Sequence, residues 1–342
     1  MTRPGASADR VGSGLSAALH SLLGARPGLV LRGEDVADPY GGAFGITRGL
    51  STAYPRRVFS TPISEGAIVG VAAGLALAGG QAIVEIMFAD FVTLCFDQIV
   101  NFLSPAVSMY GRRVEMPVII RCPVGGNRGY GPTHSQSPQK HFLGIPNLSL
   151  YELSPLHPVL TVLERALSTG SPAMFFEDKV LYTQPRFGAD RGDGIFRDAV
   201  IDSKAGWVKV CTTDVAPDWV IIAPGGLVRR TLGAMRAAFV EAEVASQLLT
   251  PARLFPLELA PVLPELAQAG RVLVVDDGVA GGGWSAEVAG QVHQELWEHL
   301  RHPVKVLQPP CAVIPAAPHL ERQMLVQEST IATALTAGRG DA

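Results

Sequence analysis

Short, almost wholly apolar segments recur along this chain, and segments with helical spacing lie between most of them. The clearest apolar segments are residues 81–88 (QAIVEIMF), 116–123 (MPVIIRCP), 172–178 (PAMFFED), 218–226 (DWVIIAPGG) and 271–278 (RVLVVDDG). Apolar strands that alternate with helices are typical of parallel sheets that are covered on both faces. The pattern therefore predicts an α/β fold with doubly wound sheets, in which ligands bind at the carboxyl ends of the strands.

One long irregular stretch, which contains TQPRFGADRGDG, interrupts the alternation. Stretches of this length without secondary structure are uncommon inside a compact domain, so it predicts a linker. A chain of 342 residues is also long enough for two domains. We therefore expect a flexible tail over residues 1–14, an α/β domain over 15–185, a linker over 186–209 and a second α/β domain over 210–342.

The composition argues against several classes of function. The net charge is −3 and no basic block occurs, which argues against a nucleic-acid partner. The longest apolar run, residues 66–80, is shorter than the roughly 20 residues of a membrane span, and the polar opening lacks the apolar core of a signal peptide. The four cysteines have no CxxC spacing, so they predict neither disulfides nor a cysteine zinc site. We therefore expect a cytoplasmic protein without a membrane or nucleic-acid partner.

Glu65 stands at the start of a predicted helix over residues 65–77, with Ser64 as its expected N-cap. In one interpretation, the Glu65 carboxylate only complements the helix dipole. In the other, another backbone packs closely on a stripe of small residues in this helix and desolvates Glu65; the stripe is Gly66, Gly70 and Gly74. A desolvated carboxyl group retains its proton more readily and can share it with a heterocyclic nitrogen, which is a catalytic capability.

Two further segments follow predicted strands. His134 lies in a glycine-rich loop, residues 124–139, whose glycines allow it to curl around a ligand. It is either an acid–base group or an ordinary loop histidine. Residues 88–91 (FADF) lie at the end of a strand, where the aromatic rings either belong to the core or stack on a flat ligand.

Several segments in order resemble one family. They are GEDVADPYGGAFGITRGL, TPISEGAIVGVAAGLALAG, FADFVTLCFDQIVN, GPTHSQS, PAMFFEDKVLY, DWVIIAPGG and DDGVAGGGWSAEVAG, and the likeness covers residues 28–335. The chain resembles the beta subunit of thiamine-diphosphate-dependent 2-oxoacid dehydrogenases, the decarboxylating component of pyruvate, branched-chain 2-oxoacid and acetoin dehydrogenase complexes. The resemblance implies a transketolase-like pyrimidine-binding domain followed by a transketolase C-terminal-like domain.

The resemblance also implies roles for individual residues. Glu65 would hydrogen-bond a ring nitrogen of the cofactor's aminopyrimidine and so help to activate the thiazolium carbon. Met87 and Phe91 would pack against the pyrimidine, and Glu34 would be a second acid of the site. His134 would assist proton transfers or the handover of the acyl group.

The diphosphate half of such a site is not expected in this chain. The family holds Mg²⁺ and the diphosphate through a GDG motif and a later Asn. The one GDG here, residues 192–194, lies in the polar linker and is interpreted as a turn. We therefore expect an alpha subunit that supplies Mg²⁺ and the diphosphate site, in an α₂β₂ heterotetramer.

Some family members also bind K⁺ through backbone carbonyls. In this chain these would be the carbonyls of Val118, Ala166, Thr169 and Ser171, and the alternative is a plain helix-ending turn.

Three functions remain open at this stage. In the first, the chain decarboxylates a 2-oxoacid with its alpha subunit and acylates the lipoyl domain of an acyltransferase. In the second, a transketolase-like enzyme of a biosynthetic pathway passes a two-carbon or acyl unit to a carrier protein or an aldehyde. In the third, the chain is a non-catalytic scaffold, although the joint presence of Glu34, Glu65, Phe91 and His134 argues against this.

Overall fold

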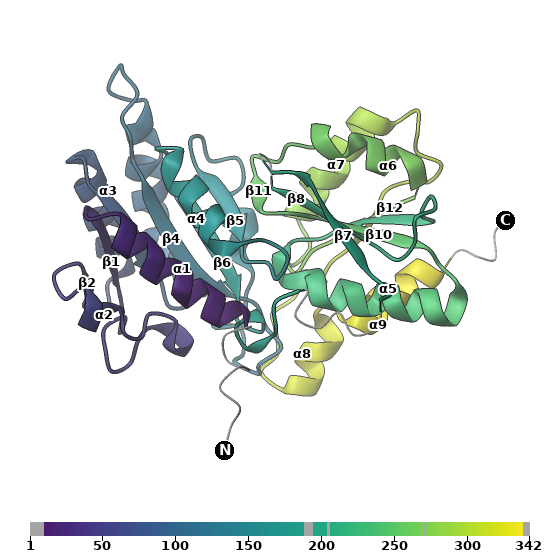
Figure 1. Cartoon of the computed structure of the whole chain (residues 1–342), viewed down its shortest axis with the longest axis horizontal. Coiled ribbons are helices and arrows are strands. Elements are labelled where there is room, and N and C mark those ends of the chain that lie inside the picture. The colour runs from purple at the N-terminus through teal and green to yellow at the C-terminus, as the bar shows by residue number, and fades with distance from the viewer. Residues whose placement is uncertain (1–9, 188–193, 204–205, 270, 338–342) are drawn as a thin grey trace. The chain divides into compact units, whose positions relative to one another are not determined.

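The computed structural model describes residues 10–187, 194–203, 206–269 and 271–337 (Figure 1). The chain forms two compact units, Met1–Gly125 with Phe142–Ala189, and Gly126–His141 with Asp190–Ala342. Each unit is built on a sheet with helices, which confirms the predicted α/β class. Among the described residues, no helix is long and apolar enough to cross a membrane.

The first unit contains a sheet of parallel strands in the order β5-β6-β4-β3-β1-β2. The strands are β1 (Leu29–Gly33), β2 (Val58–Ser60), β3 (Gln81–Glu85), β4 (Val118–Val124), β5 (Ser149–Glu152) and β6 (Ala173–Asp178). Every residue of β4 and β6 is buried, as expected of central strands that are covered on both faces. β3, β4 and β6 coincide with the apolar segments 81–88, 116–123 and 172–178, which the sequence predicted as strands.

Helices cover both faces of this sheet. They are α1 (Val11–Ala25), α2 (Leu50–Ala53), α3 (Glu65–Leu77) and α4 (Val159–Ser168), with the short helices η1 (Ala43–Gly45), η2 (Ala89–Cys95), η3 (Gln98–Leu103), η4 (Pro105–Val107), η5 (Pro138–Phe142) and η6 (Leu181–Thr183). The crossover through α3 runs from β2 to β3 and the crossover through α4 runs from β5 to β6, in opposite directions along the sheet. Because such crossovers are right-handed, the two helices lie on opposite faces. α3 packs against η2 and η3, and α4 packs against α1.

The second unit contains a mixed sheet in the order β13-β12-β9-β10-β8-β7. Its strands are β7 (Arg197–Asp202), β8 (Trp207–Cys211), β9 (Trp219–Ile222), β10 (Ser246–Pro251), β12 (Val272–Val275) and β13 (Lys305–Leu307); β11 is Arg253–Phe255. β9, β10, β12 and β13 are parallel, whereas β7 and β8 are antiparallel to their neighbours. β7 falls within residues 186–209, so part of the expected linker contributes an edge strand.

The helices of the second unit are α5 (Val228–Ala242), α6 (Leu263–Ala269), α7 (Trp284–Leu296), α8 (Pro318–Met324) and α9 (Glu328–Thr336), with η7 (Gly225–Leu227) and η8 (Ala260–Val262). α9 packs along α5, and α6 packs against α7. The indole nitrogen of Trp219 in β9 donates to the carbonyl of Leu335 in α9 at 3.0 Å, which ties the C-terminal helix to the sheet.

Candidate functional site

Glu34 follows β1 and is buried, with 6% of its surface exposed. The preceding residue, Gly33, lies opposite Glu85 of β3, and a Cβ on it would lie 2.6 Å from the Glu85 carbonyl oxygen. Burial raises the pKa of the Glu34 carboxyl group, and the nearby Glu65 carboxylate raises it further. Asp35 and Glu85 add smaller contributions in the same direction. The fold therefore brings Glu34 within electrostatic range of Glu65, although 30 residues separate them along the chain.

Glu65 is the first residue of α3 and is also buried, at 8% exposure. Ser64 occupies the N-cap position as predicted, but its side chain makes no hydrogen bond to the helix. Burial raises the pKa of the Cys95 thiol to about 12, and the charges of Glu65 and Glu34 contribute to this shift. Two carboxyl groups and a thiol thus form one buried cluster, in which the thiol stays protonated and is no nucleophile at neutral pH.

Two buried polar atoms near this cluster lack a hydrogen-bond partner among the described residues. They are Oε1 of Glu34 and Oγ1 of Thr61. Thr61 directly follows β2, and its N–H donates to the Gly33 carbonyl at 2.9 Å, so both atoms belong to the carboxyl ends of adjacent strands. Buried polar atoms without partners are rare in native proteins, because each costs roughly 1–3 kcal/mol. These atoms therefore fit a polar ligand that supplies the missing hydrogen bonds.

Met87 and Phe91, the predicted pyrimidine contacts, follow β3 and are both half-buried. Phe91 lies in η2, and its N–H donates to the Phe88 carbonyl at 2.9 Å. η2 packs against α3, where a Cβ on Gly66 would lie 3.3 Å from the Leu94 carbonyl oxygen. The segment that carries Phe91 therefore lies close to the start of the helix that carries Glu65.

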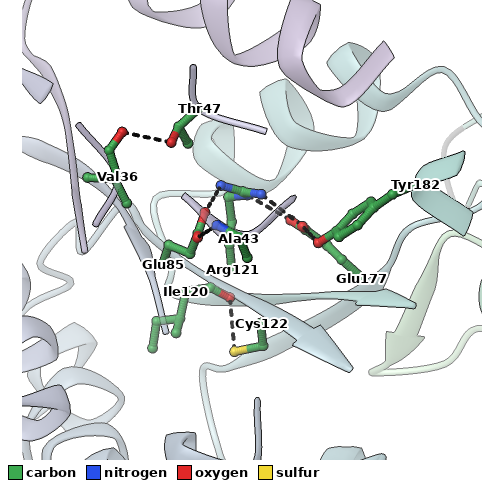
Figure 2. A network of polar contacts seen from close by, with 9 residues as sticks. All are labelled: Val36, Ala43, Thr47, Glu85, Ile120, Arg121, Cys122, Glu177 and Tyr182. Atoms are coloured by element: carbon green, nitrogen blue, oxygen red, sulfur yellow. Dashed lines mark hydrogen bonds and ion pairs between the residues drawn. The ribbon is translucent and has the colours of Figure 1, made fainter. Parts of the chain in front are cut away.

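A buried ionic network around Arg121 lies within the same unit (Figure 2). Arg121 of β4 donates through Nη1 to Glu85 at 2.7 Å, and through Nε and Nη2 to Glu177 at 2.7 and 2.8 Å. The Tyr182 hydroxyl donates to Glu177 at 2.5 Å, and the N–H of Ala43 donates to Glu85 at 2.8 Å. The network thus joins three strands to the loop that follows Glu34.

Aromatic contacts extend this network toward Met87. The Phe44 ring lies 5.4 Å from the Tyr182 ring and 6.1 Å from the Phe88 ring, centroid to centroid. Nζ of the buried Lys179 lies 5.1 Å from the centre of the Phe88 ring, a cation–π geometry. The segment next to Met87 is therefore held by side chains from η1 and from the end of β6.

His134 belongs to the second unit, although it follows a strand of the first. It is half-buried, and its Nδ1 lies 3.0 Å from the Thr133 hydroxyl. Sequence reasoning placed this histidine in the first domain, because residues 124–139 directly follow β4. The contacts of residues 126–141 are instead mainly with the C-terminal part of the chain.

The two remaining predicted features are the potassium loop and the GDG motif. In the predicted potassium loop, Nη2 of Arg113 donates to the Thr169 carbonyl at 2.8 Å and to the Ser171 hydroxyl at 3.0 Å. The Ala166 carbonyl accepts from the Thr169 hydroxyl at 2.9 Å, and Val118 pairs with Ala82 in the sheet. Residues 192 and 193 of the GDG motif lie outside the described residues.

Sequence reasoning missed two residues of this region. Thr61 belongs to the TPISE segment, where a polar residue directly after a strand could have been recognised as a candidate. Arg121 is the one charged residue of the apolar segment 116–123. An arginine there must be buried, and a buried arginine requires carboxylate partners. Its presence could therefore have predicted a network, but not which carboxylates take part.

Known domain families match most of the chain. The transketolase pyrimidine-binding domain matches residues 10–185, and the transketolase C-terminal domain matches residues 209–331. Among solved structures, a split-gene transketolase in an inactive β4 tetramer is similar with a TM-score of 0.68 at 20% identity, over 95% of this chain and 96% of that one. This likeness shows the fold alone.

Curated relatives show to which family of transketolase-like proteins the chain belongs. The beta subunit of acetoin:2,6-dichlorophenolindophenol oxidoreductase from Cupriavidus necator is 30% identical over 90% of both chains. The pyruvate dehydrogenase E1 beta subunit from Leifsonia xyli is 32% identical over 85% of this chain and 83% of that one. The beta subunit of 3-methyl-2-oxobutanoate dehydrogenase from Mycobacterium tuberculosis is 28% identical over 85% and 80%. The chain therefore belongs to the transketolase-like family of E1 beta subunits of thiamine-diphosphate-dependent 2-oxoacid dehydrogenases.

Proposed function

We propose that this chain, together with an alpha subunit in an α₂β₂ heterotetramer, decarboxylates a 2-oxoacid and transfers the acyl unit to a lipoyl domain. The observation that carries the proposal is the buried Glu34–Glu65 pair, with an unpartnered Glu34 oxygen, at the carboxyl edge of a transketolase-like sheet. Such a site suits a cationic, nitrogen-rich ligand, because a carboxylate can both accept and share a proton there.

Four residues of the first unit would hold the aminopyrimidine of thiamine diphosphate: Glu34, Glu65, Met87 and Phe91. When bound, this cofactor supplies a nucleophilic thiazolium carbon that attacks the 2-oxo group and accepts the electrons released by decarboxylation. Glu65 would hold a proton toward the pyrimidine nitrogen, and the half-buried Met87 and Phe91 would exclude water from the ring. Burial raises the pKa of Glu34 and so favours its protonated form, which would donate a hydrogen bond to the cofactor.

The alpha subunit would hold Mg²⁺ and the diphosphate. The two domain families that match this chain are the pyrimidine-binding and the C-terminal domains, which supports a site shared between chains. The names of the relatives also support a partner, because each is the beta subunit of its enzyme.

His134 would assist the handover of the acyl group. In that step the lipoyl disulfide gains two electrons, one sulfur forms the thioester and the other becomes a thiol. A half-buried imidazole can deliver the proton that this second sulfur needs. The geometry that supports the role is a half-buried ring on a glycine-rich loop, with a hydroxyl at its Nδ1.

Potassium binding by the carbonyls of Val118, Ala166, Thr169 and Ser171 stays a prediction. Arg113 argues against it, because a guanidinium already lies on the Thr169 carbonyl and would repel a second cation. Within the same loop the Thr169 hydroxyl also donates to the Ala166 carbonyl at 2.9 Å and accepts the N–H of Ser171 at 3.2 Å.

The decisive experiment is an activity screen of the heterotetramer. The chain is co-expressed with candidate alpha subunits and offered pyruvate, branched-chain 2-oxoacids and acetoin. Reduction of 2,6-dichlorophenolindophenol reports oxidation, and mass spectrometry of a lipoyl domain reports acylation. We expect substrate-dependent acylation of the lipoyl domain. Acyl transfer to an aldehyde or a carrier protein, but not to any lipoyl domain, would instead establish the transketolase-like alternative, which the named relatives do not favour.

A further inference from the structure

The loop that carries His134 lies on the C-terminal segment of the chain. We infer that this segment, residues 316–327, fixes the conformation of the His134 loop (residues 126–137), with Glu321 as the positioning residue. The inference rests on the proposed role of His134 for its catalytic consequence, but not for its structural part. Both segments belong to the second unit.

Glu321 makes the central contact. It lies in α8 with 1% of its surface exposed, and its Oε2 accepts the N–H of Gly129 at 2.9 Å. Its Oε1 is buried without a hydrogen-bond partner among the described residues. A buried carboxylate is unfavourable unless it is hydrogen-bonded, so the Gly129 amide compensates part of the cost of burying Glu321. The position of the loop and the burial of Glu321 therefore depend on each other.

The glycines of the loop fit closely against the same segment. A Cβ on Gly126 would lie 2.4 Å from Cδ1 of Leu325 and 2.9 Å from Oε1 of Glu321. Gly129 and Gly131 have φ values of +69° and +77°, which side chains rarely adopt, and each lies close to residues 316–318. These glycines thus allow close contact with the C-terminal segment, and Gly129 and Gly131 also adopt backbone conformations that side chains disfavour.

A second contact ties the loop to the body of the unit. Nε2 of Gln327 donates to Oδ1 of Asn127 at 3.0 Å, and Gln327 is itself the N-cap of α9 in a reciprocal capping pair with Thr330. The neighbouring Val326 carbonyl accepts from Arg230 of α5 at 2.6 Å, and Arg230 also binds Asp277 after β12. The loop is therefore connected, through the C-terminal segment, to the sheet of the second unit.

The far end of the loop has its own attachment. Nζ of Lys140 donates to the carbonyls of Val279 and Gly281 at 3.1 and 3.3 Å. With both ends attached, the contact of Glu321 with Gly129 holds the part of the loop that leads to His134. Loss of that contact should move or loosen His134 without unfolding the unit.

The test compares three variants of the α/β complex: Glu321→Ala, Glu321→Gln and Arg322→Ala. Gln keeps an acceptor for the Gly129 amide, and Arg322 is an exposed neighbour in the same helix. We expect hydrogen exchange in a peptide covering residues 126–137 to be at least about tenfold faster in Glu321→Ala, and to stay close to wild type in the other two. Unchanged exchange in Glu321→Ala would overturn the inference.

Activity measurements then separate the inference from the proposed function. His134→Ala serves as the reference in the dye-reduction and lipoyl-acylation assays. We expect Glu321→Ala to impair the same assay as His134→Ala, by about tenfold or more, and Glu321→Gln to restore it. A Glu321→Ala enzyme with faster exchange but full activity, beside an impaired His134→Ala enzyme, would overturn the catalytic part. If His134→Ala is fully active and hydrogen exchange is faster in Glu321→Ala, the positioning by Glu321 stands and the role proposed for His134 fails.

Discussion

Arg121 and Glu177 form a two-point ion pair inside the first unit, with Nε–Oε1 and Nη2–Oε2 distances of 2.7 and 2.8 Å and no exposed surface on either side chain. The pair joins the two central strands β4 and β6, and Arg121 also holds Glu85 of β3. Removal of the arginine leaves two buried carboxylates without their cation. We expect Arg121→Gln to lower the free energy of unfolding by about 3–5 kcal/mol.

Urea unfolding of the isolated chain, followed by circular dichroism, measures this effect. Arg112→Gln is the matched control, because Arg112 is exposed in the same unit and its loss should change the free energy of unfolding by less than about 0.5 kcal/mol. Equal effects of the two substitutions would show that the network contributes little to stability.

Glu34 is expected to reduce the stability of the unliganded chain. Its pKa is higher in the folded chain than its ordinary value, because burial and the Glu65 charge disfavour the ionised form. As the pH rises above about 4.5, the unfolded chain releases this proton first, so stability falls. Glu34→Gln cannot ionise. Its melting temperature should therefore rise relative to wild type as the pH is raised from 4 to 7.

Scanning calorimetry at several pH values checks this, with the exposed Glu241→Gln as control. In the α/β complex the same Glu34→Gln change should weaken thiamine diphosphate binding. A melting-temperature difference that does not depend on pH would contradict the assignment of Glu34 as a buried, proton-retaining group.

The contribution of Asp38 to stability should depend on pH in the opposite direction. Hydrogen bonds from the Thr52 hydroxyl at 2.6 Å, the Gly49 amide at 2.7 Å and the Ser51 hydroxyl at 2.8 Å hold the pKa of Asp38 well below its ordinary value. Its contribution to stability is therefore complete above the unfolded pKa of about 3.9, and is lost as the pH falls further.

Asp38→Asn should thus melt below wild type at pH 6, and the difference should shrink as the pH is lowered from 4 to 2. Thr52→Val, which removes one donor, should show a smaller effect of the same form. If the difference in melting temperature between Asp38→Asn and wild type stayed constant from pH 4 to pH 2, the charge of Asp38 would be ruled out as its cause.

Glu65→Gln tests the proton-sharing role in the assembled enzyme. Because a positioned acid–base group contributes about 100- to 10,000-fold to a rate, we expect kcat to fall by that order while the affinity for thiamine diphosphate changes less than tenfold. Steady-state dye reduction measures kcat, and Glu164→Gln, an exposed glutamate of α4, is the control. Full activity of Glu65→Gln would support the scaffold alternative.

The local pattern of the sequence was sufficient to predict most of the elements. The apolar segment 116–123 contains most of strand β4 (Val118–Val124), and α3 spans Glu65–Leu77 as the segment after Ser64 predicted. The prediction for Ser64 was less accurate: the residue occupies the N-cap position, but its side chain makes no hydrogen bond to the helix. A hydrogen bond of this kind depends on the rotamer and on the path of the preceding chain, which a motif does not specify.

The relationships between distant segments could not be predicted. Arg121 had to be paired with carboxylates, but Glu85 and Glu177 lie 36 and 56 residues away, and only the strand order makes them neighbours. Likewise, nothing near His134 in the sequence indicates Glu321, 187 residues later. The resemblance selected Glu34 and Glu65, whereas the effect of the Glu65 charge on the pKa of Glu34 follows from the pairing of β1 with β2, the strands that precede these two residues.

The central claim is that this chain holds only the pyrimidine half of a shared cofactor site. Calorimetric titration with thiamine diphosphate and Mg²⁺ tests it most directly, first on the chain alone and then on its complex with an alpha subunit. We predict binding by the complex and none by the chain alone. Tight, Mg²⁺-dependent binding by the chain alone would contradict the claim, because this chain would then hold the diphosphate itself.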